Sequence, residues 1–191
     1  GEYVDGKKEG KWTWFEKGKD KGWQENYVSG TLNGKFHNLS IHAQNRGKGT
    51  YDNGTRTGDW EEYYGKEDGS LERKQSGAYV FGKKEGVWSH YKKNGRRTAE
   101  GTYKNNIKEG SWTEGPDIDF GSRFYGKGQY LNNKKSGEWK YVAPQENPTI
   151  TGQFSDGKPS GEWVVRYNKK TYKGTLKEVI KKVPKLNEYK F

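Results

Sequence analysis

The chain has 191 residues, a net charge of +11 and only 28% hydrophobic residues, a balance that on bulk numbers suits a disordered chain. It contains no cysteine, which excludes disulfides, thiolate metal sites and a cysteine nucleophile. Its apolar runs are all shorter than the ~18 residues that a membrane-spanning helix needs.

Aromatic residues nevertheless recur in a fixed pattern. Each copy spans ten residues: an aromatic residue, any residue, a turn pair, three variable residues, a Gly, any residue and a second aromatic residue. Successive copies start 24 to 28 residues apart. A fixed period of this length is typical of stacked supersecondary units. We predict that the first and last rings of every copy form the core. The seven copies are Tyr3–Trp12, Tyr27–Phe36, Tyr51–Trp60, Tyr79–Trp88, Tyr103–Trp112, Tyr130–Trp139 and Phe154–Trp163.

Each copy is predicted to be a β-hairpin. In the first, residues 2–4 are extended, Asp5-Gly6 supplies turn chemistry, and the strand that carries Trp12 and Trp14 returns. The second Gly of the copy, Gly10, is expected where a neighbouring ring leaves no room for a Cβ atom. A phosphate-binding set of glycines is the alternative, but no helix or Lys-Ser/Thr pair follows them. The fold class is therefore all-β, an elongated array of about seven antiparallel hairpins.

Three stretches interrupt the period, and insertions into repeat arrays often carry binding residues. They are His37–Arg46, Gly115–Gly126 and Ala143–Thr149.

A short amphipathic helix is predicted over Thr175–Val183. Thr175 and Glu178 fit a capping box, aliphatic residues recur at helical spacing, and Pro184 stops the run. We divide the chain into the hairpin array, residues 1–174, and a capping helix with its tail, residues 175–191.

The repeats resemble MORN repeats. The strings that carry the resemblance run from Tyr3 to Trp12 and from Tyr79 to Trp88, and the likeness covers about residues 1–170. It is closest to the bacterial variant, which implies a non-catalytic stack of hairpins used for protein contacts, membrane association or scaffolding. That variant occurs in antitoxin components and in exported envelope proteins. Asn106 and Asn133 depart from the pattern at the turn Gly, but Asn tolerates the left-handed conformation.

No catalytic set is recognisable. His37, His42 and His90 lack metal-ligand spacing with an acidic partner, and we expect surface histidines. Asp117 and Asp119 resemble the start of a calcium loop without its later Gly and Glu. We expect no enzyme, no cofactor, no metal and no small-molecule substrate.

Two surfaces are candidates for binding a partner. Lysines of the hairpin turns are expected to form a row, which could also be a set of solubilising turns that blocks edge aggregation. A second group follows the repeat tryptophans at odd offsets and should face away from them, unless it packs in a second core. The turn lysines are Lys7, Lys8, Lys83, Lys84, Lys134 and Lys135, and the second group is Phe15, Tyr63, Tyr91 and Arg166.

These features favour a non-enzymatic module that binds a protein along one face, as a bacterial antitoxin, an immunity factor or a subunit of an envelope assembly. The alternative is a peripheral binder of an anionic membrane or another polyanion through the lysine row; nucleic acid is disfavoured. The chain starts at Gly1 and contains no Met, so we expect a processed product, with export to the envelope favoured over the cytoplasm.

Overall fold

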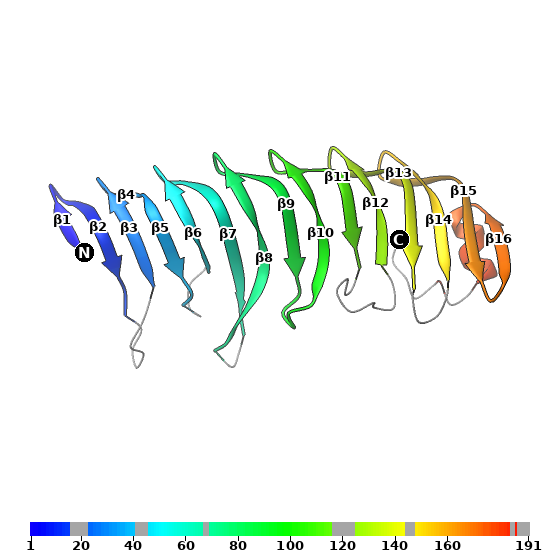
Figure 1. Cartoon of the computed structure of the whole chain (residues 1–191), viewed down its shortest axis with the longest axis horizontal. Coiled ribbons are helices and arrows are strands. Elements are labelled where there is room, and N and C mark those ends of the chain that lie inside the picture. The colour runs from blue at the N-terminus through cyan, green and yellow to red at the C-terminus, as the bar shows by residue number, and fades with distance from the viewer. Residues whose placement is uncertain are drawn as a thin grey trace. The chain divides into compact units, whose positions relative to one another are not determined.

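The computed structural model of the chain describes residues 1–15, 23–40, 46–66, 69–115, 125–143, 148–183 and 186. Within them it contains sixteen β-strands and one α-helix, so the predicted all-β array of hairpins is confirmed (Figure 1). The strands belong to one antiparallel sheet whose order follows the chain, except that β4 pairs with β3 outside that path.

The bounds of the elements follow the repeat. They are β1 (Glu2–Val4), β2 (Lys7–Thr13), β3 (Gln24–Val28), β4 (Thr31–Leu32), β5 (Gly34–Asn38), β6 (Gly47–Asp52), β7 (Thr55–Gly65), β8 (Leu71–Val80), β9 (Lys83–Tyr91), β10 (Arg97–Lys104), β11 (Ile107–Glu114), β12 (Tyr125–Leu131), β13 (Lys134–Val142), β14 (Thr149–Ser155), β15 (Lys158–Tyr167), β16 (Lys170–Gly174) and α1 (Leu176–Lys182).

Tertiary contacts divide the chain into two compact units. The first comprises Gly1–Gly95 with Lys104–Asn106, and the second Arg96–Tyr103 with Ile107–Phe191. The second unit therefore contains both the last hairpins and α1. The division predicted from the sequence lies between residues 174 and 175, where the strands end and the helix begins, and it differs from the division by contacts.

The hairpin tips are turns with two left-handed residues. In the first copy Asp5 has φ 47° and Gly6 has φ 72°, as the type I′ turn of a two-residue hairpin requires. Asn106, with φ 69°, takes the place of the turn Gly, and its side-chain Oδ1 accepts a hydrogen bond of 2.6 Å from the backbone N–H of Lys84. Asn133 makes the same contact with the Lys108 N–H at 2.7 Å. The two departures from the repeat thus add a bond between hairpins.

The glycine seven residues after the first ring has a different role from the predicted one. A Cβ atom added at Gly58, Gly86 or Gly137 would meet no heavy atom within 4 Å, and the φ angles of these glycines lie between 63° and 68°. They are needed for a left-handed backbone, not for space. The prediction of a close ring at this position was wrong.

The close approach occurs instead at a glycine two residues before the first ring. A Cβ at Gly77 would lie 2.4 Å from the Trp88 indole, and one at Gly128 would lie 2.3 Å from Trp139. Strand register shifts at both glycines, as at a β-bulge. In the second copy the corresponding residue is Glu25, and there the second ring is the smaller Phe36.

Within each unit the repeat rings pack edge to face. Tyr79 stands against Trp60 at 6.1 Å and Trp88 at 5.0 Å between centroids, and Phe154 stands against Trp163 at 5.4 Å. The Trp88 indole N–H donates to the Ala78 carbonyl at 3.1 Å, a contact that recurs in the neighbouring copies. The buried rings of the repeat are Phe36, Trp60, Tyr79, Trp88, Tyr103, Trp112, Trp139, Phe154 and Trp163.

The remaining repeat rings are partly or largely exposed. Tyr3 is 63% exposed, whereas Trp12, Tyr27, Tyr51 and Tyr130 are of intermediate burial.

The three interrupted stretches are shorter than predicted. His37 and Asn38 continue β5, Tyr125 and Gly126 begin β12, and Thr149 begins β14, because each pairs with a neighbouring strand. His42, Asp117 and Asp119 lie outside the described residues.

The helix α1 forms as predicted, with Thr175 as its N-cap. Both bonds of the capping box are present, from the Glu178 N–H to Thr175 Oγ1 at 3.4 Å and from the Thr175 N–H to Glu178 Oε2 at 2.7 Å. Buried Val179 and Val183 hold the helix, which contacts β15 and β16.

Candidate interaction surfaces

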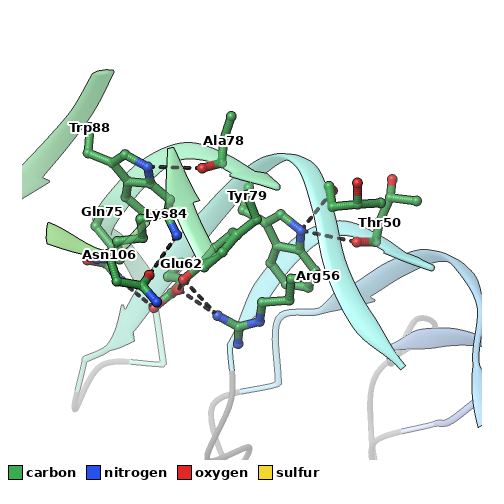
Figure 2. Close-up of polar contacts among 11 residues, drawn as sticks. Thr50, Arg56, Glu62, Gln75, Ala78, Tyr79, Lys84, Trp88 and Asn106 are labelled. Atoms are coloured by element: carbon green, nitrogen blue, oxygen red, sulfur yellow. Dashed lines mark hydrogen bonds and ion pairs between the residues drawn. The ribbon is translucent and has the colours of Figure 1, made fainter. Parts of the chain in front are cut away.

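Charged side chains around Tyr79 and Trp88 form a network with the aromatic rings (Figure 2). The Arg56 guanidinium lies over the Trp60 ring at 4.5 Å and donates to Glu62 Oε1 at 2.8 Å. The Tyr79 hydroxyl donates to the same carboxylate oxygen at 3.1 Å, and burial together with this charge raises the pKa of Tyr79 to about 12. The Gln75 amide donates to the other oxygen of Glu62 at 2.8 Å, so both carboxylate oxygens are hydrogen-bonded within the chain.

The second unit repeats this arrangement around Glu114. Lys108 Nζ lies 3.0 Å and the Tyr130 hydroxyl 2.8 Å from Glu114 Oε1, while Lys135 Nζ lies 3.4 Å from Oε2. Burial would raise the pKa of the Glu114 carboxyl, but the two ammonium groups and these hydrogen bonds hold it below its ordinary value. Burial also lowers the pKa of Lys135 in spite of its acidic partner. We call these two clusters the inner networks.

The predicted lysine row divides into two sets. Lys8, Lys84 and Lys135 lie over tryptophan rings, with Nζ 5.0 Å from Trp12, 4.2 Å from Trp88 and 4.2 Å from Trp139. Their neighbours Lys7, Lys83 and Lys134 are exposed. The reason is strand alternation, because adjacent residues of a strand face opposite sides. The expectation that both lysines of a turn share one outer row is corrected accordingly.

The exposed lysines stand beside exposed aliphatic residues. Val4 pairs with Lys7 and Val80 pairs with Lys83 in the first unit, and Leu131 pairs with Lys134 in the second. These three aliphatic side chains are about half exposed, at 50%, 47% and 54%. Lys134 also forms an ion pair of 2.5 Å with Asp156. We call the lysine and aliphatic pairs the tip pairs.

The opposite face of the first unit carries a compact aromatic and charged cluster. Lys48 Nζ and the Arg73 guanidinium each lie 2.6 Å from Glu61, and the Tyr63 hydroxyl donates to Glu61 Oε2 at 2.6 Å. The guanidinium also lies 5.6 Å from the centre of the Tyr91 ring. We call these five residues the outer cluster.

The outer cluster is held in one arrangement by its central carboxylate. Burial would raise the pKa of Glu61, but hydrogen bonds from Lys48 and Tyr63 and the charge of Arg73 keep it below its ordinary value. Burial and the bond to Glu61 raise the pKa of the Tyr63 phenol. Arg73 remains 42% exposed, so the cluster offers a fixed cation to the surroundings.

Two of the four predicted outer residues, Tyr63 and Tyr91, belong to this cluster. Phe15, which is 73% exposed, and Arg166, which is also exposed, are not among its five residues. Sequence reasoning missed Lys48, Glu61 and Arg73. Lys48 and Glu61 come together through the pairing of β6 with β7, and Arg73 is brought opposite Tyr63 by a register shift between β7 and β8. The sequence does carry a signal for the inner networks, since Lys108 and Trp112 are four residues apart and strand alternation places both on one face.

The described part of the chain shows no cluster of side chains suited to a metal ion. His37 lies in β5 and His90 in β9, and no three His, Asp or Glu side chains among the described residues are placed to hold a metal ion. An open pocket of about 610 Å³ lies beside α1, and its accessible surface is mainly apolar. It is lined by Pro159, Thr175, Leu176, Lys177, Ile180 and Lys181.

Neither a protein-family model nor a curated protein matches the chain. Among the described residues, α1 is too short and too polar to cross a membrane, and no other helix is present there.

Proposed function

We propose that this chain is a non-enzymatic binding module that holds a protein partner against the outer cluster of its first unit. The observation that carries the proposal is the arrangement of Tyr63, Arg73 and Tyr91 around one carboxylate. Tyrosine and arginine dominate the energetics of protein interfaces. Their rotamers are already restrained by contacts within the chain, so less conformational entropy is lost on binding.

The surrounding chemistry supports a protein partner over a small molecule. A small ligand needs a concave pocket with convergent polar groups. The outer cluster instead places its polar atoms on a sheet face, where β-strand alternation makes them point outward. The resemblance of the repeats to the bacterial MORN variant favours the toxin of a toxin–antitoxin pair or a subunit of an envelope assembly as the partner.

The test begins with a tagged full chain expressed in its source cells and identification of the proteins that co-purify. The purified partner is then titrated with wild type, Arg73→Ala and Tyr91→Ala. Loss of a hot-spot residue should weaken binding about 30-fold. Arg166→Ala is the matched control, since Arg166 is exposed and lies outside the cluster. Equal effects of Arg73→Ala and Arg166→Ala, or no effect of either, would contradict the proposal.

A second function is favoured by the tip pairs. Exposed aliphatic side chains next to lysines are suited to anionic membrane surfaces, where the charge attracts the headgroups and the side chains enter the interface. Vesicles of phosphatidylglycerol and vesicles of phosphatidylcholine distinguish this function. Binding only to the anionic vesicles, lost in high salt and in Lys7→Glu/Lys83→Glu, supports it. Binding that is absent, or insensitive to both changes, rejects it.

A further inference from the structure

One hairpin tip carries a residue that the other six copies avoid. Phe81 is the first turn residue of the hairpin β8–β9, has φ 48° and is 86% exposed. Asn and Asp reach this backbone conformation at low cost because their short polar side chains bond locally, whereas a bulky aromatic residue does not. The equivalent residues of the other copies are Asp5, Ser29, Asn53, Asn105, Asn132 and Asp156.

The surroundings of Phe81 do not explain it as a structural residue. A buried ring could compensate for a strained backbone through packing, but this ring is almost wholly in solvent. Val80 beside it is 47% exposed, and Val87 on the same hairpin is 63% exposed. At the position of Val87 the other copies have charged or polar residues, namely Lys11, Lys35, Asp59, Ser111, Glu138 and Glu162.

We propose that Phe81 is an anchor that inserts into an apolar pocket of a protein partner, with Val80 packing at the rim of that pocket. This contact goes beyond the outer cluster, because Phe81 precedes β9 and Tyr91 ends it, at opposite ends of a nine-residue strand. A ring buried in a pocket is a typical interface hot spot. Insertion of the ring into a partner then explains both the strained backbone and the exposed side chain of Phe81.

The neighbouring tips favour a protein pocket over a bilayer. The Gly82 N–H donates to the Arg56 carbonyl at 3.0 Å, and the Asn106 N–H donates to the Lys84 carbonyl at 3.0 Å, so three successive hairpins are joined near their tips. The turns on either side of Phe81 carry Asn53 and Asn105. Membrane contact through the tip pairs needs only shallow insertion, whereas a flat membrane that buried the whole Phe81 ring would have to take up these polar turns as well. A concave protein surface can receive the single ring alone.

The stability test uses Phe81→Asn. Asn relieves the strained φ angle, so the melting temperature should rise by about 2–4 °C. A rise shows that any loss of binding is not a loss of folding. A fall in melting temperature would overturn the inference, because Phe81 would then be a stabilising residue.

The binding test places the photo-crosslinking amino acid p-benzoylphenylalanine at position 81 of the full chain in its source cells, and at position 53 as the matched control. The protein captured from position 81 is purified and titrated with wild type, Phe81→Asn, Phe81→Tyr and Asn53→Asp. We expect Phe81→Asn to weaken binding about 30-fold, Phe81→Tyr to keep most of the affinity and Asn53→Asp to have no effect.

Four results of the binding test would overturn the inference: no product from position 81, identical products from positions 81 and 53, crosslinked phospholipid as the only product, or a captured protein that binds Phe81→Asn as tightly as wild type. Binding to vesicles of equal parts phosphatidylglycerol and phosphatidylcholine tests a membrane as the partner directly. If wild type bound these vesicles and Phe81→Asn did not, the anchor would be assigned to a membrane. The outer cluster is tested separately by Arg73→Ala, so either proposal can fail while the other stands.

Discussion

Most copies of the repeat contain two glycines, and each position requires glycine for a different structural reason. Gly128 lies at a β-bulge under the Trp139 ring, while Gly137 provides a left-handed backbone where space is free. Steric exclusion by a buried ring and backbone strain have different energies, so substitutions can tell them apart.

Gly128→Ala should cost more stability than Gly137→Ala. The new methyl group would meet the fully buried Trp139 indole, which costs about 3 kcal/mol, whereas the left-handed Ala at 137 costs about 1 kcal/mol. Urea unfolding measures both. Trp139→Phe combined with Gly128→Ala should recover part of the loss, because the second copy, which has Glu25 in place of this glycine, has Phe36 in place of the tryptophan. Equal costs for the two glycines would show that the ring can move aside.

A second prediction concerns Glu114 and pH. Its pKa in the folded chain lies below that of the unfolded chain, so its contribution to stability is present above the unfolded value and is lost as pH falls through the folded value. Glu114→Gln should therefore flatten the decline of stability between about pH 5 and pH 3. At pH 7 it should cost about 2 kcal/mol, because Lys108 and Lys135 lose their partner.

Thermal melts at several pH values check this prediction. Glu138→Gln is the matched control, since Glu138 lies on β13 and is exposed. An acid decline of the same steepness in Glu114→Gln and wild type would assign the pH dependence to other carboxylates.

At the scale of the element, α1 is too short to be stable alone and depends on its cap and its packing. Val179 and Val183 are buried on the last hairpins, while Leu176 and Ile180 are partly buried beside Pro159. In five other copies the position of Pro159 holds Lys or Arg over the tryptophan. The last copy instead has Pro159 there, beside the apolar side chains of Leu176 and Ile180.

Thr175→Ala should destabilise α1 by about 1 kcal/mol, because the Glu178 N–H loses its acceptor. Thr175→Ser keeps the hydroxyl and should keep the stability. Hydrogen exchange at the Val183 N–H, which bonds the Val179 carbonyl at 3.1 Å, reports the change locally. Unchanged exchange in Thr175→Ala would mean that packing alone holds the helix.

At the scale of the whole molecule, stability in a repeat array is expected to vary between copies, because each hairpin depends mainly on its neighbours. Burial differs clearly along the chain. Every residue of β1 is exposed, whereas β13 and β14 contain fully buried Trp139 and Ile150.

Amides of β1 and β2 should therefore exchange with solvent faster than those of β13 and β14. Native-state hydrogen exchange followed by mass spectrometry measures the difference, with β13 and β14 of the same molecule as the internal control. Uniform protection of all four strands would contradict this prediction and show that the array opens as one cooperative unit.

The sequence by itself determined the hairpin period, the turns and the capped helix. Asp5-Gly6 and the Thr175–Glu178 box act within a few residues, and the ring spacing of Tyr79 and Trp88 sets the inward face through strand alternation. These signals are local, so they can be recognised without coordinates. They also explain why a chain with so few hydrophobic residues folds, since its rings are in register.

Only the tertiary structure decided which side chains meet across strands. Arg73, Glu61 and Tyr91 come from three strands, and their contact depends on a register shift that no local pattern marks. The two roles of the glycines were likewise set by where the indole of Trp88 or Trp139 lies. The physical reason is that a β-bulge changes which residues are opposite one another, and this is fixed by packing between strands rather than by residues adjacent in the chain.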